Sequence, residues 1–206
     1  GAALVMAEMT CVSADARITP GCPGLYAPQH TVAWRRVVDA VHAASDAKIG
    51  IQLGHAGAKG STRAMWDGID QPLVEGNWPL VSASPQQYLA GVSQTARAMT
   101  LADMDRIEGH FVRATRAADE AGFDWVELHC AQVNLLSSYN TPLTNELDGP
   151  YGGSLDNRSR FLVEIITAIR RWDARISAEH PATRVLLCIL PSLSFALGMA
   201  TRWLLA

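Results

Sequence analysis

The sequence is poor in the features that mark several classes of protein. It has only four cysteines in 206 residues, and they form neither a CxxC pair nor a spacing typical of zinc sites. Scattered cysteines of this kind favour free thiols in a reducing cytoplasm over a disulfide framework. Lysine and arginine form no basic stripe, and the formal net charge is -3 at pH 7. That weak negative charge argues against nucleic acid or a membrane surface as a partner.

Long uncharged hydrophobic runs are also missing. The most apolar stretch, residues 185–206, is interrupted by Pro191 and Arg202. Its uncharged core is therefore shorter than the roughly 18 to 20 residues that span a bilayer. The chain opens on an apolar run, Ala2–Met6, with no charged leader and no starting methionine. We expect a cytoplasmic protein without a membrane segment, and an opening inside an apparent strand suggests a piece of a longer chain.

The order of apolar patterns predicts a parallel α/β sheet. The chain is 49% hydrophobic and 18% charged, which suits one globular domain of ordinary size. Short apolar runs predict four buried strands, at residues 4–10, 48–53, 126–130 and 185–190. Apolar residues spaced by three and four predict helices between them, at residues 31–44, 100–122 and 161–172. Strands that alternate with helices at this spacing are typical of parallel sheets.

The second of these helices carries signals at both ends. Thr100 is followed three residues later by Asp103, the spacing of a reciprocal N-terminal cap. Gly122 is placed to end the same helix, as a C-terminal glycine does. The helix is therefore expected to lead directly into the central strand.

Two segments are expected to lack regular structure. Residues 59–98 are rich in Gly, Pro, Ser and Gln, and loops of that length are usually functional covers. Trp66 and Trp78 would give such a cover an apolar body. A surface excursion with a small core of its own fits the same composition equally well. Residues 135–145, which include Pro142, are expected to form a second loop.

Polar side chains stand at the carboxyl ends of three predicted strands. They are Glu8 and Thr10, Gln52 and His55, and His129 and Gln132. Because the carboxyl ends of parallel strands meet at the edge where such folds bind ligands, this recurrence predicts an active face there. A lone histidine is often a hydrogen-bonded core residue, so the inference depends on the three pairs together.

Four motifs carry a resemblance to a known family. They are Gln52–Gly57 (QLGHAG), Glu127–Ala131 (ELHCA), Ser138 with Pro142–Asn145 (PLTN), and Tyr151–Arg158 (YGGSLDNR). In combination they resemble the Old Yellow Enzyme family, FMN-dependent NAD(P)H oxidoreductases built on a (β/α)₈ TIM barrel. The resemblance runs over residues 1–172 and implies a partial barrel, from about the second strand of the family to the fifth. Residues 173–206 would be a diverged apolar tail that contains the fifth strand.

Three further segments are similar to one subgroup of that family. They are Ile18–Cys22, Gly24–Pro28 and Glu75–Ser84. The subgroup is the reductase domain of 2-aminobenzoyl-CoA monooxygenase/reductase and salicylyl-CoA 5-hydroxylase-like proteins. This similarity implies an aromatic acyl-CoA as one form of the small-molecule substrate.

The resemblance also implies an activity and roles for particular residues. The family passes hydride from NAD(P)H through FMN to an α,β-unsaturated or dearomatised carbonyl compound, the ene-reductase reaction. His129 and Gln132 stand where the family places the two catalytic donors that hold the substrate carbonyl oxygen. Gln52 stands at the position of the glutamine that bonds the flavin ring. The backbone of Glu8, Met9 and Thr10 would flank that ring, and no metal is implied.

The chain departs from the family pattern around the same residues. Gln132 replaces the usual His or Asn, and Val133 replaces a glycine. Asn134 stands at the position of the tyrosine that commonly protonates the substrate, and an amide is no acid near neutral pH. Gly149 replaces an expected aspartate. Tyr139 is not expected to take over the role of the missing tyrosine.

Length leaves alternatives open. A TIM barrel needs about 250 residues, and the family's fifth-strand arginine and its phosphate site after the seventh and eighth strands have no counterpart here. A further chain or domain would have to complete the barrel, or the chain is a non-catalytic fragment. A metal-dependent barrel hydrolase is a third hypothesis, with His55, His129 and Glu8 as the ligands.

Overall fold

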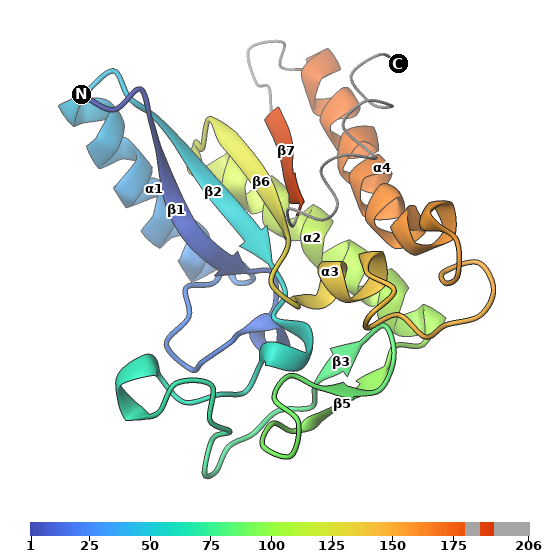
Figure 1. The fold of residues 1–206 in the computed structure, drawn as a ribbon. Helices are drawn as coiled ribbons and strands as arrows, with labels where there is room; N and C mark the ends of the chain where they lie inside the picture. The colour runs from blue at the N-terminus through green and yellow to red at the C-terminus, as the bar shows by residue number, and fades with distance from the viewer. Residues whose placement is uncertain (180–185, 192–206) are drawn as a thin grey trace.

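A four-stranded parallel sheet forms the centre of the molecule. The computed structural model describes residues 1–179 and 186–191 (Figure 1). The strands lie in the order β1-β2-β6-β7, and each neighbouring pair is parallel. Their bounds are Leu4–Cys11, Lys48–Gly54, Trp125–Cys130 and Leu186–Pro191. The four predicted strands and their parallel arrangement are therefore confirmed.

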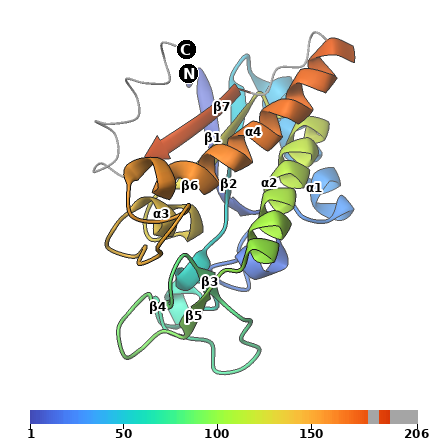
Figure 2. The same ribbon diagram turned by 90° about the vertical axis from the view of Figure 1, so that its right-hand side faces the viewer.

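Three long helices lie side by side on one face of this sheet (Figures 1 and 2). They are α1 (Pro28–Ala44), α2 (Leu101–Ala121) and α4 (Leu155–Glu179). Along the chain, each of them lies between two consecutive strands of this sheet, the arrangement of βαβ units. The described part of the chain is thus a partial α/β barrel wall with its helices outside.

Helix α2 begins and ends where the sequence predicts. The Thr100 Oγ1 accepts a hydrogen bond from the Asp103 backbone N–H at 3.2 Å, and the Asp103 carboxylate accepts one from the Thr100 N–H at 2.9 Å. This reciprocal cap satisfies two N–H groups that the first helical turn leaves without partners. Gly122 ends the helix in the left-handed conformation, with φ of 92°.

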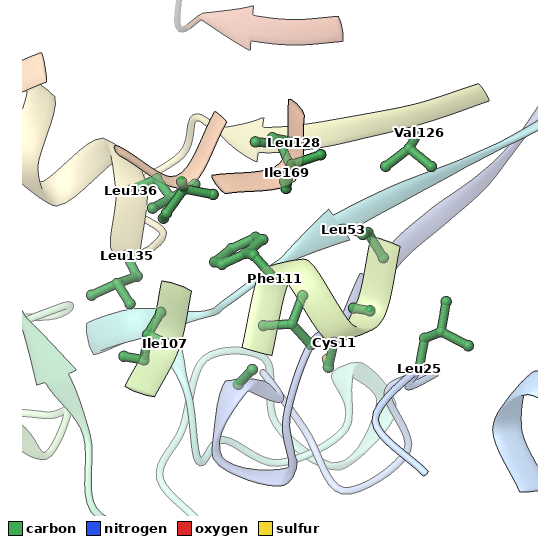
Figure 3. Packing of buried hydrophobic residues seen from close by; sticks show 14 of the residues in the cluster. Cys11, Leu25, Leu53, Ile107, Phe111, Val126, Leu128, Leu135, Leu136 and Ile169 are labelled. Carbon is green, nitrogen blue, oxygen red and sulfur yellow. The ribbon is translucent and has the colours of Figure 1, made fainter. Parts of the chain in front are cut away.

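The hydrophobic core lies between α2 and the sheet. Phe111 of α2 is fully buried at its centre, against Leu53 of β2, Leu128 of β6 and Ile169 of α4 (Figure 3). Burying one such side chain contributes about 1.5–3 kcal/mol relative to leaving it in water. This cluster fixes β6 between its neighbours and so fixes the direction in which the carboxyl end of β6 points.

The first strand is not buried as predicted. Leu4 and Met6 of β1 are 40% and 42% exposed. The reason is that β1 is an edge strand of the described sheet and has β2 as its one neighbouring strand within it. The pairing also shifts register between Ala7 and Met9, so that Glu8 forms a bulge with no partner on β2.

The long segment after β2 is a small subdomain, not an irregular loop. Strands β3 (Val81–Ser82), β4 (Gln86–Gln87) and β5 (Thr95–Ala98) form a second sheet in the order β3-β5-β4. Ala58, Leu80 and Ala96 form its core, and Trp78 packs against them. Trp66 is 86% exposed and contributes nothing to it. The structure therefore confirms a small core of its own for this segment, and the role of a functional cover stays a prediction.

Short helices complete the chain. One-turn 3₁₀ helices occupy Ala14–Ala16, Gly57–Lys59 and Met65–Asp67. Helix α3, Leu135–Asn140, lies where the sequence predicts a loop, so that prediction was wrong. Its Ser, Tyr and Asn residues are mediocre helix formers, but every side chain of α3 is buried. Tertiary packing, which local sequence patterns do not report, stabilises this helix.

The predicted division after Trp172 falls inside helix α4, which continues to Glu179. The last predicted strand is present as β7, paired with β6 from Trp125 onward. The remainder of the predicted tail, residues 180–185 and 192–206, lies outside the described residues. Within the described ranges, no helix is long and apolar enough to cross a membrane.

Candidate active site

A cavity of about 340 Å³ opens at the carboxyl ends of β1, β2 and β6. Four of the predicted site residues line it, and they are Met9, Gln52, His129 and Gln132. Ile18, Ala131 and Asn134 complete its wall. A larger hollow of about 700 Å³ lies between β1 and α1, but Arg36 is the only ionisable side chain among the residues that line it. The smaller cavity is therefore the one that carries groups able to do chemistry.

His129 is held neutral at the end of β6. Its residue is 8% exposed, and burial lowers the pKa of the imidazole below its usual value. The positive charge of Lys59 lowers the pKa further, and a hydrogen bond with Gln132 opposes both effects. The Nδ1 atom has no hydrogen-bond partner among the described residues. This nitrogen is itself buried, while the neutral ring forms part of the cavity wall.

Gln132 reaches the cavity from a tight turn. The Asn134 N–H donates to the Ala131 carbonyl at 3.1 Å, and the two residues between them have φ of 56° and 62°. Positive φ at both central positions is the signature of a type I′ turn, which usually requires Gly, Asn or Asp. Gln132 and Val133 occupy it instead, and a β-branched residue there is strained. The turn brings the Gln132 side chain back to His129.

Gln52 and Glu127 form a pair on neighbouring strands. The Gln52 Nε2 donates a hydrogen bond to Glu127 Oε1. Because the Glu127 oxygen accepts this hydrogen bond, the amide nitrogen of Gln52 faces Glu127. The amide carbonyl oxygen then remains as an acceptor for a ligand. Glu127, which is 7% exposed, is a site residue that the sequence reasoning missed. An ionisable residue inside a buried apolar strand was the signal that could have found it.

Glu8 and Thr10 do not line the cavity. Glu8 is exposed at the bulge of β1, and Thr10 is fully buried. The Thr10 hydroxyl donates to the Glu8 carbonyl at 3.1 Å. This bond uses the hydroxyl to hold the bulge, which sets the position of Met9 between them. The structure therefore brings together four of the six predicted residues, and the roles of all six remain predictions.

His55 is buried and does not line the cavity; its contacts hold neighbouring backbone in place. It is 2% exposed, its Nδ1 accepts from the Gly57 N–H at 3.1 Å, and burial lowers its pKa to about 4. Its carbonyl accepts from the Leu135 N–H at 2.9 Å, which fixes the start of α3. A Cβ on Gly57 would lie 2.8 Å from that Leu135 nitrogen, so the close approach requires glycine. This segment clamps α3 instead of lining the cavity.

Tyr139 and Asn134, the residues considered as proton donors, do not offer an acidic group to the cavity. The buried Tyr139 ring packs on Phe161 with centroids 5.1 Å apart, and burial raises the pKa of its hydroxyl. Asn134 lines the cavity, and its Nδ2 donates to the Ala131 carbonyl at 3.1 Å. Among the described residues, no three His, Cys, Asp or Glu side chains gather as a metal site. The hydrolase hypothesis therefore lacks a ligand set.

Neutral imidazole and amide groups at the carboxyl ends of parallel strands define a ligand site of the α/β-barrel class. Comparison with known proteins gives the particular family. Residues 1–187 match the NADH:flavin oxidoreductase / NADH oxidase family, and the chain belongs to it. This confirms the resemblance at the level of the family, and with it the assignment to a partial TIM barrel.

Individual relatives agree. The chain is 37% identical over 174 residues to an NADH:flavin oxidoreductase of Gibberella zeae, covering 82% of this chain and 42% of that protein. It is 37% identical over 185 residues to an NADPH dehydrogenase of a Geobacillus species, covering 86% and 50%. The solved structure of morphinone reductase superposes with a TM-score of 0.72 at 26% identity, covering 90% of this chain and 49% of that one. The chain thus spans about half the length of the relatives it matches.

Proposed function

We propose that this chain forms the substrate-facing half of an FMN-dependent NAD(P)H oxidoreductase of the ene-reductase type. The observation that carries the proposal is the meeting of Met9, Gln52, His129 and Gln132 at one cavity. The family is named for reaction between NADH and a flavin, which supports the cofactor class. Because the chain spans about half of its relatives, the activity is proposed for the barrel of which it is a part.

The residues present fit one edge of a flavin ring. Gln52, with its amide nitrogen held by Glu127, offers a carbonyl oxygen to a ring N–H. Met9 supplies an apolar contact beside it, and the backbone of Glu8 and Thr10 would flank the ring. FMN, when bound, supplies the redox chemistry, accepting reducing equivalents from NAD(P)H and passing them to the substrate. The cavity's other polar groups are then available to the substrate.

His129 and Gln132 would hold the carbonyl oxygen of that substrate. As an activated alkene is reduced, negative charge develops on this oxygen, and fixed hydrogen-bond donors stabilise it. A neutral imidazole and a primary amide each supply an N–H donor without a charge that would bind other anions indiscriminately. Asn134 lines the cavity where the family resemblance expects a tyrosine. We therefore assign protonation of the α-carbon to a water molecule.

The substrate class follows from this arrangement. Donors aimed at one oxygen suit an α,β-unsaturated or dearomatised carbonyl compound. An aromatic acyl-CoA is the narrower proposal, and it rests on the resemblance of segments 18–22, 24–28 and 75–84 to the acyl-CoA reductase subgroup. Its kcat/KM is to be compared with that of a simple enone.

The first experiment is a visible spectrum of the purified chain after incubation with FMN and desalting. Retained flavin absorbance that bleaches on addition of NAD(P)H is the result that the proposal requires. A colourless eluate from a folded chain favours the alternative, a non-catalytic fragment of such an enzyme. The coverage of about half of each relative is the observation behind that alternative. Adding the missing half as a separate chain then decides whether binding is restored.

A variant tests the donor role. In the flavin-loaded protein, His129→Ala should lower enone reduction by about 100- to 1000-fold, the usual loss for one oxyanion donor. His42→Ala is the matched control, because His42 pairs at 2.8 Å with Asp124, which precedes β6 and so lies toward the other end of that strand. An unchanged rate in the His129 variant would remove the role assigned to this residue.

A further inference from the structure

Two cysteines meet beside the candidate site. Cys11 is the last residue of β1 and is fully buried, whereas Cys22 lies in the loop that follows and is partly exposed. The loop turns back along the strand end: the Cys11 N–H donates to the Pro23 carbonyl, and the Leu25 N–H donates to the Cys11 carbonyl, both at 2.9 Å. The two thiol groups are within hydrogen-bonding reach and interact with each other.

The backbone pairing explains why the two sulfur atoms can approach. Cys11 stands opposite Gly24 in an isolated parallel bridge. The Cys11 N–H bonds to the carbonyl of Pro23, the residue that directly follows Cys22, so this backbone contact brings the two cysteines next to each other. A disulfide between them requires their Cα atoms to lie about 4.4–6.8 Å apart.

The surroundings lower the pKa of the Cys22 thiol and raise the pKa of the Cys11 thiol. The hydrogen bond from Cys11 is the main cause that lowers the pKa of Cys22, and burial opposes it. The Thr19 N–H adds a donor at 3.3 Å from the Cys22 Sγ, and the Ile18 backbone adds another. The same thiol pairing, together with burial, raises the pKa of Cys11. Cys22 is therefore the nucleophilic thiolate, and Cys11 is the thiol behind it.

We propose that Cys11 and Cys22 form a redox-reactive dithiol that hydrogen peroxide converts into a disulfide. The accessible Cys22 Sγ attacks one peroxide oxygen, an S–O bond forms, the O–O bond breaks, and the leaving oxygen departs as water after taking a proton. The Cys11 Sγ then attacks the Cys22 sulfur, an S–S bond forms and the S–O bond breaks. The hydroxide that leaves takes the Cys11 proton and becomes a second water. Two thiols lose two electrons, and one peroxide gains them.

This modification site is independent of the proposed flavin function, although it adjoins the same cavity. Ile18, whose backbone contacts both thiols, also lines the cavity wall. The dithiol needs no flavin and no completed barrel, because every group that builds it lies between Cys11 and Leu25. A test on the chain alone therefore addresses the dithiol whatever the outcome of the flavin experiment.

Peptide mapping gives a direct test. Trypsin cleaves after Arg17 and Arg35, so Cys11 and Cys22 end in different peptides, residues 1–17 and 18–35. The chain is treated with hydrogen peroxide, blocked with N-ethylmaleimide, digested and examined by mass spectrometry without reductant. The expected product is the 1–17/18–35 pair joined by a disulfide, and dithiothreitol should separate it. Recovery of both peptides with the maleimide adduct after peroxide treatment would overturn the proposal.

Variants separate the two steps. Cys11→Ser should prevent the link and leave Cys22 as a sulfenic acid that dimedone traps, whereas Cys22→Ser should leave Cys11 unmodified. Trapping of Cys11 in the absence of Cys22 would reverse the assigned roles and contradict the proposal. Circular dichroism checks that each variant is folded.

A measurement on the unmodified chain does not depend on variants. At about pH 6.5, two units below the ordinary thiol pKa, Cys22 should be alkylated by iodoacetamide on the order of tenfold or more faster than the buried Cys130. Equal rates at the two cysteines would contradict the thiolate assignment.

Discussion

Replacing Val133 by glycine should stabilise the protein, because this residue holds a conformation that its side chain opposes. Its φ is 62°, in the left-handed region. Such a conformation costs roughly 1–2 kcal/mol for an L-residue, with the upper end expected for a β-branched one. Glycine removes that strain but loses about 0.5–1 kcal/mol in backbone entropy. The expected net gain in the free energy of unfolding is about 1 kcal/mol.

Val133→Ala isolates the cause. Alanine keeps the Cβ atom that strains the left-handed backbone, so at this position alanine should be less stable than glycine by about 1 kcal/mol. In the interior of helix α2 the order reverses, and Ala117→Gly should destabilise the protein by about 0.5–1 kcal/mol. The opposite signs at the two positions separate backbone strain from any general effect of glycine.

Urea denaturation followed by circular dichroism measures these differences. The midpoint should move without a change in the slope, since the surface exposed on unfolding is nearly the same in all the variants. If Val133→Ala proved as stable as Val133→Gly, the strain assigned to the turn at residues 131–134 would be refuted.

Two further outcomes follow from contacts in the fold. The Arg97 guanidinium, 2.7 Å from the carboxylate, holds the pKa of Asp103 below its ordinary value. A lowered folded-state pKa adds stability above the unfolded pKa that is lost as pH falls through the folded one. Unfolding free energies of the wild type and Asp103→Asn should therefore converge in acid, and parallel curves would contradict this role. Gly152→Ala should cost about 2 kcal/mol or more, since its Cβ would lie 1.7 Å from the Leu147 carbonyl oxygen. Gly153→Ala, with nothing within 4 Å of its Cβ, is the control and should lose only the roughly 1–2 kcal/mol of left-handed strain.

Local patterns were sufficient where one segment decides its own structure. The cap at Thr100 and Asp103, the terminating Gly122 and the strand at Trp125–Cys130 are all read from a few consecutive residues. Helix α3 was missed because its stability comes from burial against other elements, which its own sequence does not show. Strand β1 was predicted to be buried, since an apolar run carries no signal of whether the strand lies at an edge.

The residues of the candidate site were likewise predicted where local patterns sufficed and missed where contacts between distant segments decide. Gln52, His129 and Gln132 were found because strand ends of parallel sheets converge. Glu127 was overlooked because its importance comes from Gln52 on a different strand. The four cysteines looked scattered in the sequence, and the meeting of Cys11 with Cys22 depends on a loop that folds back along β1. Contacts between segments separated by a turn were the information that local reasoning lacked.

The order of the strands in space, β1-β2-β6-β7, repeats their order along the chain. A sheet of this kind can grow outward from one edge as the ribosome releases each βα unit, because no later strand must insert between two earlier ones. The long excursion between β2 and β6 delays synthesis of the third strand of this sheet. Of the strand edges that later gain a partner, the edge of β2 therefore stays unpaired for the longest time. Premature pairing of that edge with another nascent chain is the misassembly to which this topology is most exposed during synthesis.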